Sequence, residues 1–245
     1  MAETLDQKVA LVTGAGRGIG RAIALDLARA GFALSLAARS SEELAETRAL
    51  TGLAANRSLI VLVDLASEDA PDNLIEATLE HFGRLDVLVN NAGWAPPRTP
   101  LIKTNTADQD RIIAVNLRAP VALTRLAATH MAKQEGGGTI VNVASAAARN
   151  TPSGEAIYAA AKAGLVAFTH ACFGEFRKYN IKISVLLPGL TDTGLIPENK
   201  RLDRSLMLTP ADIAAAVMSI VNAPPGLCPV ELTVEPAHDP MRSGR

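Results

Sequence analysis

The chain has 245 residues, of which 48% are apolar and 20% charged, and its formal net charge is −1. A single α/β core often fills this length, so we expect one domain over residues 1–245. The near-neutral charge argues against a nucleic-acid partner or an anionic membrane surface, because both require a basic excess or patch. The amino-terminal stretch MAETLDQKVALV is charged, and no uninterrupted apolar run reaches a spanning length, which predicts no signal peptide, no membrane partner and a cytoplasmic protein.

Short aliphatic runs alternate with longer helical patterns along almost the whole chain. This alternation predicts a single Rossmann-like, doubly wound parallel sheet of about seven strands, with helices on both faces. The strands are expected near residues 8–13, 33–38, 59–64, 85–90, 139–144, 181–187 and 230–235. The helices are expected near residues 18–30, 41–50, 68–82, 107–133, 155–178 and 210–222. Thr209, Pro210 and Asp212 form a start signal for the last helix.

Two long irregular segments, 93–105 and 189–208, each follow the carboxyl end of a predicted strand. Ligands bind at that edge of open α/β sheets, so both segments are candidate walls of a substrate site, with a covering loop at about 190–208. The two cysteines are expected to be reduced thiols, and the four histidines have no metal-ligand spacing. We therefore assign no metal.

A cluster of glycines lies between the first predicted strand and the first predicted helix. Gly14, Gly16, Gly18 and Gly20 occur within VTGAGRGIGRAIA. A turn without side chains lets the backbone approach a pyrophosphate, and the helix amino terminus offers free N–H groups and a partial positive charge. Glycines also make tight turns with no ligand, but the position at the first βα junction favours a dinucleotide site.

The end of the second strand bears on the choice of dinucleotide. An acidic residue there would accept hydrogen bonds from an adenosine ribose, but the sequence has Ala38 and Arg39, and Glu42 and Glu43 are expected on the following helix. With no carboxylate to repel a 2′-phosphate, Arg39 is a candidate ligand for it, and Arg17 in the glycine turn is a second. This favours NADP(H) over NAD(H), although both arginines would also suit a solvated surface.

Tyr158 and Lys162 are four residues apart in a segment rich in alanine, so a helix places them on one face. An ammonium about 4 Å from a phenol stabilises the phenolate by roughly 4 kcal/mol at an effective dielectric near 20, or about three pKa units. That change would bring the tyrosine into the working range of a general acid or base. Considered alone, the pair would equally suit a contact on the helix surface.

Taken together, six motifs resemble the short-chain dehydrogenase/reductase family over the chain from the first strand to about residue 195. The motifs are TGAGRGIG (13–20), NNAG (90–93), Asn116 in VNL, Ser145 closing IVNVAS, YAAAK (158–162) and PGLTDT (188–193). They follow the order and spacing of the family, including the usual separation between the serine and the tyrosine.

The resemblance implies a role for each of four side chains in carbonyl or alcohol chemistry. Tyr158 would exchange a proton with the substrate oxygen, and Lys162 would lower the pKa of Tyr158 and hold the nicotinamide ribose. Ser145 would donate a hydrogen bond to the substrate carbonyl, and Asn116 would position a water in a proton relay. Donors aimed at an oxygen that gains negative charge stabilise that charge.

The resemblance also implies a set of cofactor and substrate contacts. For the cofactor these are Ile19 at the phosphates, Asp64 at the adenine, Asn90, Ala92 and Gly93 on the adenosine side, and Pro188, Gly189, Thr191 and Thr193 at the nicotinamide. Beside Ser145, we expect Trp94 and Leu190 to line the substrate site, although Trp94 would also suit simple packing under its loop. The family usually forms homodimers or homotetramers through its two long helices, so a homo-oligomer is expected.

The match loosens after residue 195. Lys200, Arg201 and Arg204 would attract an acidic substrate, but cations in a polar loop are commonly just solvated. The chain also lacks the glycine-rich end of the 3-oxoacyl reductases that it otherwise resembles. We expect an NADP(H)-dependent reductase of a small-molecule ketone, or the reverse dehydrogenase; the alternatives are an NAD-linked alcohol dehydrogenase and a nucleotide-binding sensor or scaffold without turnover.

Overall fold

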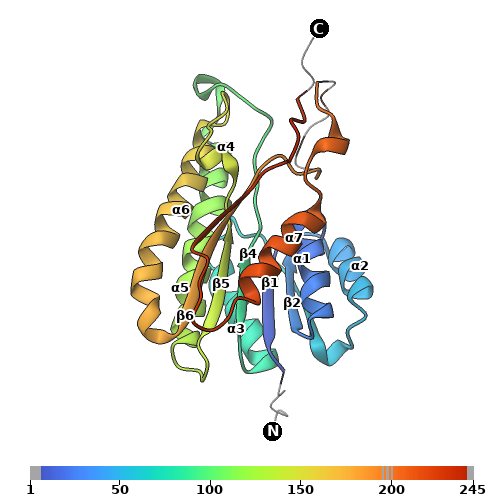
Figure 1. The fold of residues 1–245 in the computed structure, drawn as a ribbon, viewed down its shortest axis with the longest axis vertical. Coiled ribbons are helices and arrows are strands. Elements are labelled where there is room, and N and C mark those ends of the chain that lie inside the picture. The colour runs from blue at the N-terminus through green and yellow to red at the C-terminus, as the bar shows by residue number, and fades with distance from the viewer. Residues whose placement is uncertain (1–6, 195, 197–198, 200, 242–245) are drawn as a thin grey trace.

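A computed structural model describes residues 7–194, 196, 199 and 201–241 of the chain. Its centre is one sheet of seven strands in the order β3-β2-β1-β4-β5-β6-β7, and all neighbouring strands are parallel (Figure 1). The strands are β1 (Val9–Thr13), β2 (Ala33–Ala38), β3 (Ser58–Leu62), β4 (Val87–Asn90), β5 (Gly138–Val143), β6 (Ile181–Pro188) and β7 (Glu231–Val234). The predicted doubly wound parallel sheet is therefore confirmed.

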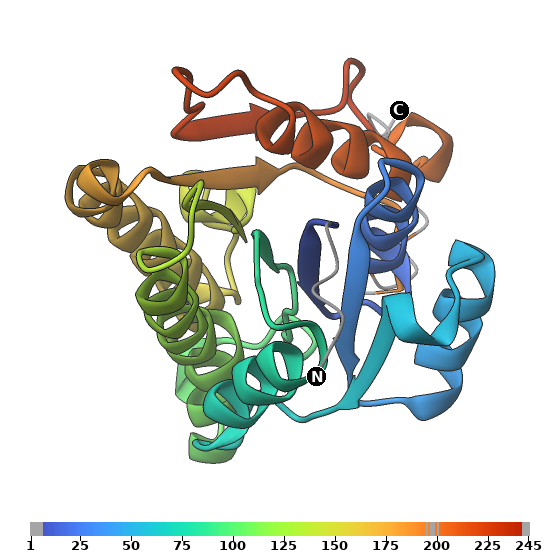
Figure 2. The same cartoon turned by 90° about the horizontal axis from the view of Figure 1, so that it is seen from below.

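Helices cover both faces of this sheet. One layer holds α1 (Gly18–Arg29), α2 (Ser41–Thr51) and α7 (Pro210–Val221); the other holds α3 (Ala70–Phe82), α4 (Thr106–Ile113), α5 (Ala119–Met131) and α6 (Ala156–Phe176). Figure 2 shows the sheet between these two layers. Because both faces are covered, the central strands are apolar on successive residues rather than on alternate ones, and every residue of β1 and β4 is buried.

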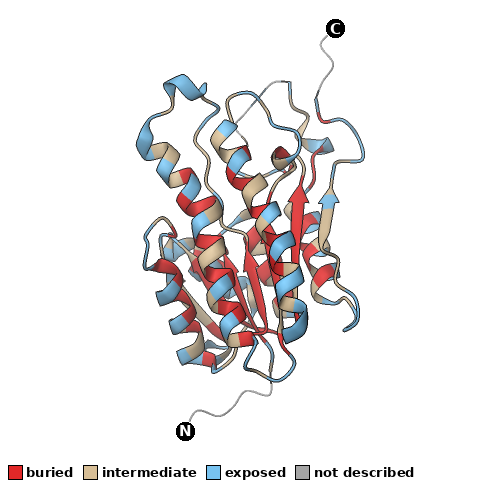
Figure 3. Cartoon of the chain, turned by 90° about the vertical axis from the view of Figure 1, so that its left-hand side faces the viewer, coloured by how far each residue is buried: buried red, intermediate tan, exposed pale blue. Residues whose placement is uncertain are grey.

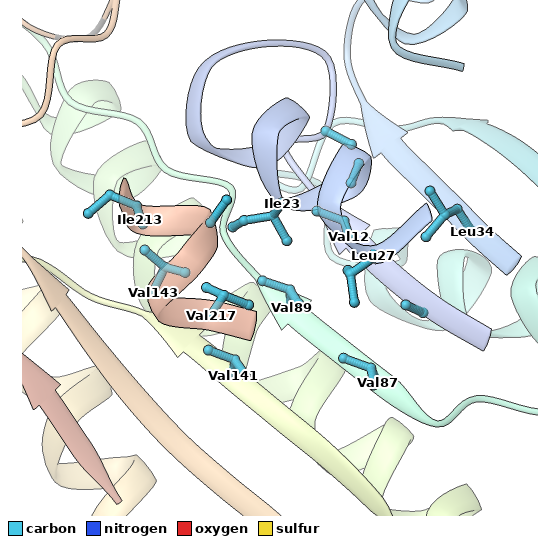
Figure 4. Packing of buried hydrophobic residues seen from close by; sticks show 14 of the residues in the cluster. Val12, Ile23, Leu27, Leu34, Val87, Val89, Val141, Val143, Ile213 and Val217 are labelled. Carbon is cyan, nitrogen blue, oxygen red and sulfur yellow. The ribbon is translucent and has the colours of Figure 1, made fainter. Parts of the chain in front are cut away.

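The larger part of the core lies between α1, α7 and the sheet. Figure 4 shows Ile23 of α1 and Ile213 and Val217 of α7 above the strand residues Val12 and Val89. All five side chains are fully buried. Truncating a buried isoleucine such as Ile23 or Ile213 to alanine typically costs about 2–5 kcal/mol, so this packing fixes where α1 begins relative to the end of β1.

Helix ends follow local chemistry that the sequence already contains. Thr209 and Asp212 exchange hydrogen bonds with each other's backbone N–H groups in a capping box, and Pro210 opens α7, as predicted. Gly52 and Gly83 end α2 and α3 in the left-handed conformation.

The helix predicted near residues 107–133 is present over Thr106–Met131, but it is not a regular α-helix throughout. The segment divides into α4, a π-helical turn over Ala114–Arg118, and α5. Pro120 has no N–H, and its ring would clash with the carbonyl group of Asn116 in a regular α-helix, so the turn widens. The backbone N–H of Ala119 accordingly donates to the Ala114 oxygen, five residues back. Such turns frequently occur at functional sites, and this one carries Asn116.

Two helical stretches are apolar enough, by length and hydropathy, to cross a membrane. These are Thr106–Met131 and Ala156–Tyr179, and 56% and 39% of their most apolar windows lie buried inside the fold. Neither stretch was expected from the sequence, because charged residues interrupt both apolar runs. Core helices of soluble proteins pass the same test, and Figure 3 shows helices banded with buried and exposed residues over buried strands, so the two stretches are weak grounds for a membrane span.

The strand order reverses direction between β1 and β4. Connections run outward to β2 and β3 on one side and to β5, β6 and β7 on the other, and ligands of such sheets bind at this switch point, outside the carboxyl ends of the strands. The segments 93–105 and 189–208 both begin at that edge, which points up in Figure 1.

Candidate active site

The glycine turn between β1 and α1 has no room for a side chain at Gly14 or Gly20. Gly14 and Gly18 have φ angles of 68° and 54°, in the left-handed region. A Cβ at Gly14 would lie 2.9 Å from the Asn91 amide nitrogen, and one at Gly20 would collide with the carbonyl oxygen of Gly14. The result is a bare backbone cradle at the amino terminus of α1, where anions bind. Ile19 lies in the first turn of that helix, as predicted.

Polar side chains tie this cradle to the end of β4. The hydroxyl of Thr13 accepts hydrogen bonds from the backbone N–H groups of Asn91 and Ala92, both at 3.0 Å. The Asn91 amide in turn donates to the Thr13 oxygen at 2.9 Å. Thr13 and Asn91 therefore hold the two central strands together at the switch point. Both residues lie within the predicted motifs TGAGRGIG and NNAG, but neither was expected to join the strands; a polar pair closing two adjacent apolar strands was the signal.

The side chain of Asn90 points away from the cradle. It is 1% exposed, and its amide donates to Asn142 at 2.8 Å and to Thr124 at 3.1 Å, under the sheet edge. The amide groups of NNAG thus stabilise the strand end, which leaves Ala92 and Gly93 as the members of this segment nearest to the rim.

On its other side the turn is clamped onto α2. Arg21 donates to the carbonyl oxygen of Gly16 through Nε at 3.0 Å and through Nη2 at 2.5 Å. The buried hydroxyl of Thr47 lies 2.9 Å from the oxygen of Ala15 and 2.9 Å from that of Glu43. Neither Arg21 nor Thr47 was predicted, because nothing in the linear sequence shows that α2 packs on the turn.

The expectation that no carboxylate lies near the ribose end of the site is wrong. Glu43 is on α2 as predicted, but its carboxylate extends back over the turn, to 2.9 Å from where a Cβ of Gly16 would be. Its Oε1 lies 3.7 Å from Nε of Arg17. A carboxylate is therefore present beside the end of β2, supplied from the helix rather than from the strand. Arg39 follows β2 and acts on Asp64 through its charge.

Asp64 and Trp94 both contact the guanidinium group of Arg111. This group donates to Asp64 at 2.8 Å and lies 5.5 Å from the centre of the Trp94 ring. Burial raises the pKa of Asp64, but hydrogen bonds from Ala66 and Arg111 and the charges of Arg111 and Arg39 outweigh it and hold the pKa below its ordinary value. The predicted adenine contact is thus an ionised carboxylate, joined through α4 to the predicted substrate wall.

Asn116 is completely buried in the π-helical turn. Its amide nitrogen donates to the oxygens of Ile112 at 2.9 Å and Trp94 at 2.6 Å, and its amide oxygen accepts from the N–H of Trp94 at 3.3 Å. A Cβ at Gly93 would lie 3.2 Å from that oxygen and 3.8 Å from Nζ of Lys162. Gly93 is therefore the point at which Asn116 and Lys162 approach each other.

Ser145 and Tyr158 are brought together by β5 and α6. Ser145 follows β5, its Oγ accepts from the N–H of Ala147 at 3.1 Å, and its side chain hydrogen bonds to Tyr158. Burial raises the pKa of Tyr158 to about 12, partly offset by the bond to Ser145, and the charge of Glu155 raises it further. At neutral pH this phenol holds its proton and can donate it.

Lys162 does not act on Tyr158 as the sequence analysis expected. Lys162 is 3% exposed, and its ammonium donates to the Val143 oxygen at 2.9 Å and lies 5.8 Å from the centre of the Tyr158 ring. Burial lowers the pKa of Lys162 to about 8. The predicted lowering of the Tyr158 pKa by Lys162 is not found in the protein without a cofactor, because burial of the phenol raises that pKa.

The segment after β6 closes the site from the α7 side. The N–H of Gly189 donates to the Val234 oxygen at 2.8 Å, and the hydroxyl of Thr191 donates to the Gly189 oxygen at 3.1 Å. Thr193 faces the glycine turn, with its methyl carbon 3.7 Å from where a Cβ of Gly18 would be. The structure thus sets Pro188–Thr193 opposite the phosphate cradle.

Further along this loop, Arg204 is paired with Asp192, whereas Lys200 lies outside the described residues. Leu190 bonds through its oxygen to the N–H of Leu208 at 2.9 Å. Tyr158 also borders a small hollow, which is lined mainly by Ala95, Pro96, Pro97, Leu101, Ile112 and Ile157. The lining is therefore largely apolar, with Glu155 among its polar members.

Both cysteines are free thiols, and burial raises the pKa of Cys172 to about 11. Within the described part of the chain, no three histidine, cysteine or carboxylate side chains form a group that could hold a metal ion.

A glycine cradle at the switch point of a doubly wound sheet, facing a serine, a tyrosine and a lysine, defines a nucleotide-binding oxidoreductase of the Rossmann type. Comparison with known proteins narrows this class. The short chain dehydrogenase family matches residues 8–203. A short-chain dehydrogenase/reductase, astE, from Aspergillus oryzae is 33% identical over 233 residues, which cover 89% of each chain. The chain belongs to the short-chain dehydrogenase/reductase family and is an oxidoreductase.

Two solved structures share the fold. A metagenomic short-chain oxidoreductase in complex with NADP superimposes with a TM-score of 0.82 at 32% identity, covering 96% of this chain and 100% of the other. A Serratia marcescens short-chain dehydrogenase/reductase carrying two substitutions gives a TM-score of 0.85 at 28% identity, with 96% and 98% coverage.

Proposed function

We propose that this protein is an NADP(H)-dependent oxidoreductase that transfers hydride between the nicotinamide and a carbonyl or alcohol substrate, with Tyr158 as the general acid or base. The observation that carries the proposal is the hydrogen bond between Ser145 and a protonated Tyr158, at the sheet edge that the glycine cradle also occupies. NADP in the metagenomic neighbour supports the choice of cofactor.

The residues present fit a dinucleotide because the cradle excludes every side chain larger than hydrogen at Gly14 and Gly20. The turn over Gly14–Gly20, with Ile19, would hold the pyrophosphate, and Arg17 and Arg39 would hold the 2′-phosphate. Asp64 and the Asn90–Gly93 segment would border the adenosine. Lys162 and the Pro188–Thr193 segment would hold the nicotinamide half.

When bound, the nicotinamide supplies hydride to a carbonyl carbon, or takes it from an alcohol. In the reductive direction Tyr158 gives its hydroxyl proton to the substrate oxygen while Ser145 donates a hydrogen bond to the same oxygen, which stabilises the developing negative charge. The resulting phenolate regains its proton from solvent, which we propose reaches it past Lys162 and the water that Asn116 positions. Because burial raises the pKa of Tyr158 to about 12, the free protein at neutral pH holds the tyrosine in the protonated form that the reductive direction needs.

Trp94, Leu190 and Ser145 would face the substrate, and the loop over residues 190–208 would cover it. The largely apolar lining of the hollow beside Tyr158 supports a small or medium ketone whose carbonyl group carries apolar substituents.

We further propose that the chain folds as a single domain and assembles into a homodimer or homotetramer in the cytoplasm. Its partner is a small-molecule substrate, with neither nucleic acid nor membrane. The exposed apolar part of α6 supports the assembly, because 39% of its most apolar window is buried within one chain.

The experiment is to incubate the purified protein with NADPH or NADH and a panel of ketones, 3-oxoacyl thioesters, quinones and sugars. We expect NADPH oxidation with at least one carbonyl compound, and a loss of about 10²–10⁴ in turnover in Tyr158→Phe with nearly unchanged NADPH affinity. Activity with NADH alone would instead favour an NAD-linked dehydrogenase. Nucleotide binding without turnover on any substrate would favour a sensor, and retained activity in Tyr158→Phe would remove this residue from the mechanism.

A further inference from the structure

We propose that Glu43 is a specificity-determining residue whose negative charge reduces the preference of the site for NADP(H) over NAD(H). The inference rests on the proposed function, because it concerns the ribose end of the same dinucleotide site. It starts from one juxtaposition: the Glu43 carboxylate lies over Gly16, beside Arg17 and next to the end of β2.

The backbone of α2 fixes Glu43 in this place. The Ser40 hydroxyl accepts from the N–H of Glu43 at 3.2 Å and so caps the helix. The carbonyl oxygen of Glu43 lies 2.9 Å from the Thr47 hydroxyl and 3.5 Å from Nη2 of Arg21. Since Arg21 and Thr47 also hold the carbonyl groups of the glycine turn, Glu43 and the turn form one rigid unit.

Gly16 provides the space that the Glu43 side chain uses. A Cβ at this position would lie 2.9 Å from both Cβ and Oε2 of Glu43, and 3.5 Å from Cβ of Ala38. The carboxylate therefore fills the space between the turn and the end of β2. This is the place at which an acidic residue accepts hydrogen bonds from an adenosine ribose when the strand itself supplies one.

The charges in this space act in opposite directions on the two cofactors. Arg17 and Arg39 attract a 2′-phosphate, whereas Glu43 repels it and competes for Arg17. An unphosphorylated ribose instead offers a hydroxyl group that donates to a carboxylate. The ion pair of Arg17 and Glu43 is open to solvent, with side chains 69% and 37% accessible, so it separates at little cost and does not block the site.

The test is a set of equilibrium dissociation constants for NADPH and NADH, measured by calorimetry on the intact protein and on Glu43→Gln. Glutamine keeps the size of the side chain and removes its charge. We expect the ratio of NADH to NADPH dissociation constants to rise by about fivefold or more, the effect of about 1 kcal/mol for two charges near 4 Å in water. The rise should shrink in about 1 M salt, which screens charges but would not cancel a structural change.

The matched control is Glu42→Gln, which removes the same charge one residue earlier. The Glu42 carboxylate accepts from the Ser40 hydroxyl at 3.1 Å and makes no ion pair in the described part of the chain. An equal rise in Glu42→Gln, or an unchanged ratio in Glu43→Gln, would overturn the proposal. If the unaltered protein binds neither nucleotide, the proposed function fails with it; if it binds NADPH and only the Glu43→Gln ratio stays fixed, this inference alone fails.

Discussion

Replacing Lys162 by methionine should change the pH dependence of stability in a way that reports its burial. Burial lowers the pKa of Lys162 from 10.5 to about 8, so the folded protein holds this charge at a cost of about 3 kcal/mol near pH 7. Methionine removes that cost but leaves the Val143 oxygen without its donor, a loss of about 1–3 kcal/mol. Near pH 7 we therefore expect Lys162→Met to be as stable as the unaltered protein or more stable by up to about 2 kcal/mol, and to lose turnover.

The sign of the pH effect follows from proton counting. Between pH 8 and pH 10.5 the unfolded chain keeps a proton on Lys162 that the folded chain has lost, so this residue makes stability rise with pH across that window. From about pH 7 to about pH 9.5 the unaltered protein should gain roughly 2 kcal/mol relative to Lys162→Met.

Urea unfolding of both proteins at these two pH values, at one protein concentration, measures the difference directly. Lys182→Met is the matched control, because Lys182 also donates to backbone oxygens, those of Ala223 at 2.7 Å and Pro224 at 2.6 Å, but is only half-buried. Lys182→Met shows the effect of losing a lysine donor that folding buries only in part. A stability difference between Lys162→Met and the unaltered protein that does not change with pH would refute the claim that folding buries the charge of Lys162.

Three further substitutions test the cofactor site. Gly20→Ala places a methyl group against the carbonyl group of Gly14, so the affinity for the nucleotide should fall by more than about tenfold. The control Gly174→Ala has open space around it, so it should bind the nucleotide normally and gain up to about 1 kcal/mol in the free energy of unfolding. Equal affinities of the two variants in calorimetry would contradict the cradle. Arg39→Asp should shift the preference toward NADH, and an unchanged ratio of kcat/KM values would show that Arg39 does not contact the phosphate. Arg111→Met should alter the emission of Trp94, the only tryptophan of the chain, and an identical spectrum would argue against their contact.

Local and periodic features of the chain could be predicted well. The strands, the capping box of α7 and the glycine turn depend on residues that are neighbours in the sequence, and the observed strand ends lie within two residues of the predicted ones. The π-helical turn between α4 and α5 was also predictable in principle, since Pro120 cannot continue a regular α-helix, but the helical periodicity of the flanking residues concealed it.

Side-chain partners across elements were harder to predict. The prediction that Lys162 lowers the pKa of Tyr158 rested on their four-residue spacing on α6. It did not include β5, whose Val143 carbonyl group accepts a hydrogen bond from the ammonium. The prediction that no carboxylate lies near the ribose likewise considered only the residues at the end of β2. The packing of α2 on the glycine turn brings the carboxylate of Glu43 back to that place. Arg111 joins Asp64 to Trp94 for the same kind of reason, through three separate elements.

The sequence by itself therefore determined the doubly wound fold, the phosphate cradle and the identity of Ser145, Tyr158 and Lys162 as a group, because motif spacing and hydrophobic periodicity are properties of the chain. Only the tertiary structure decided the charge state of the site. Burial of the phenol and the ammonium, and the approach of Glu43 to Gly16, arise where helices pack on the sheet, and desolvation and Coulomb energies depend on those distances rather than on separation along the chain.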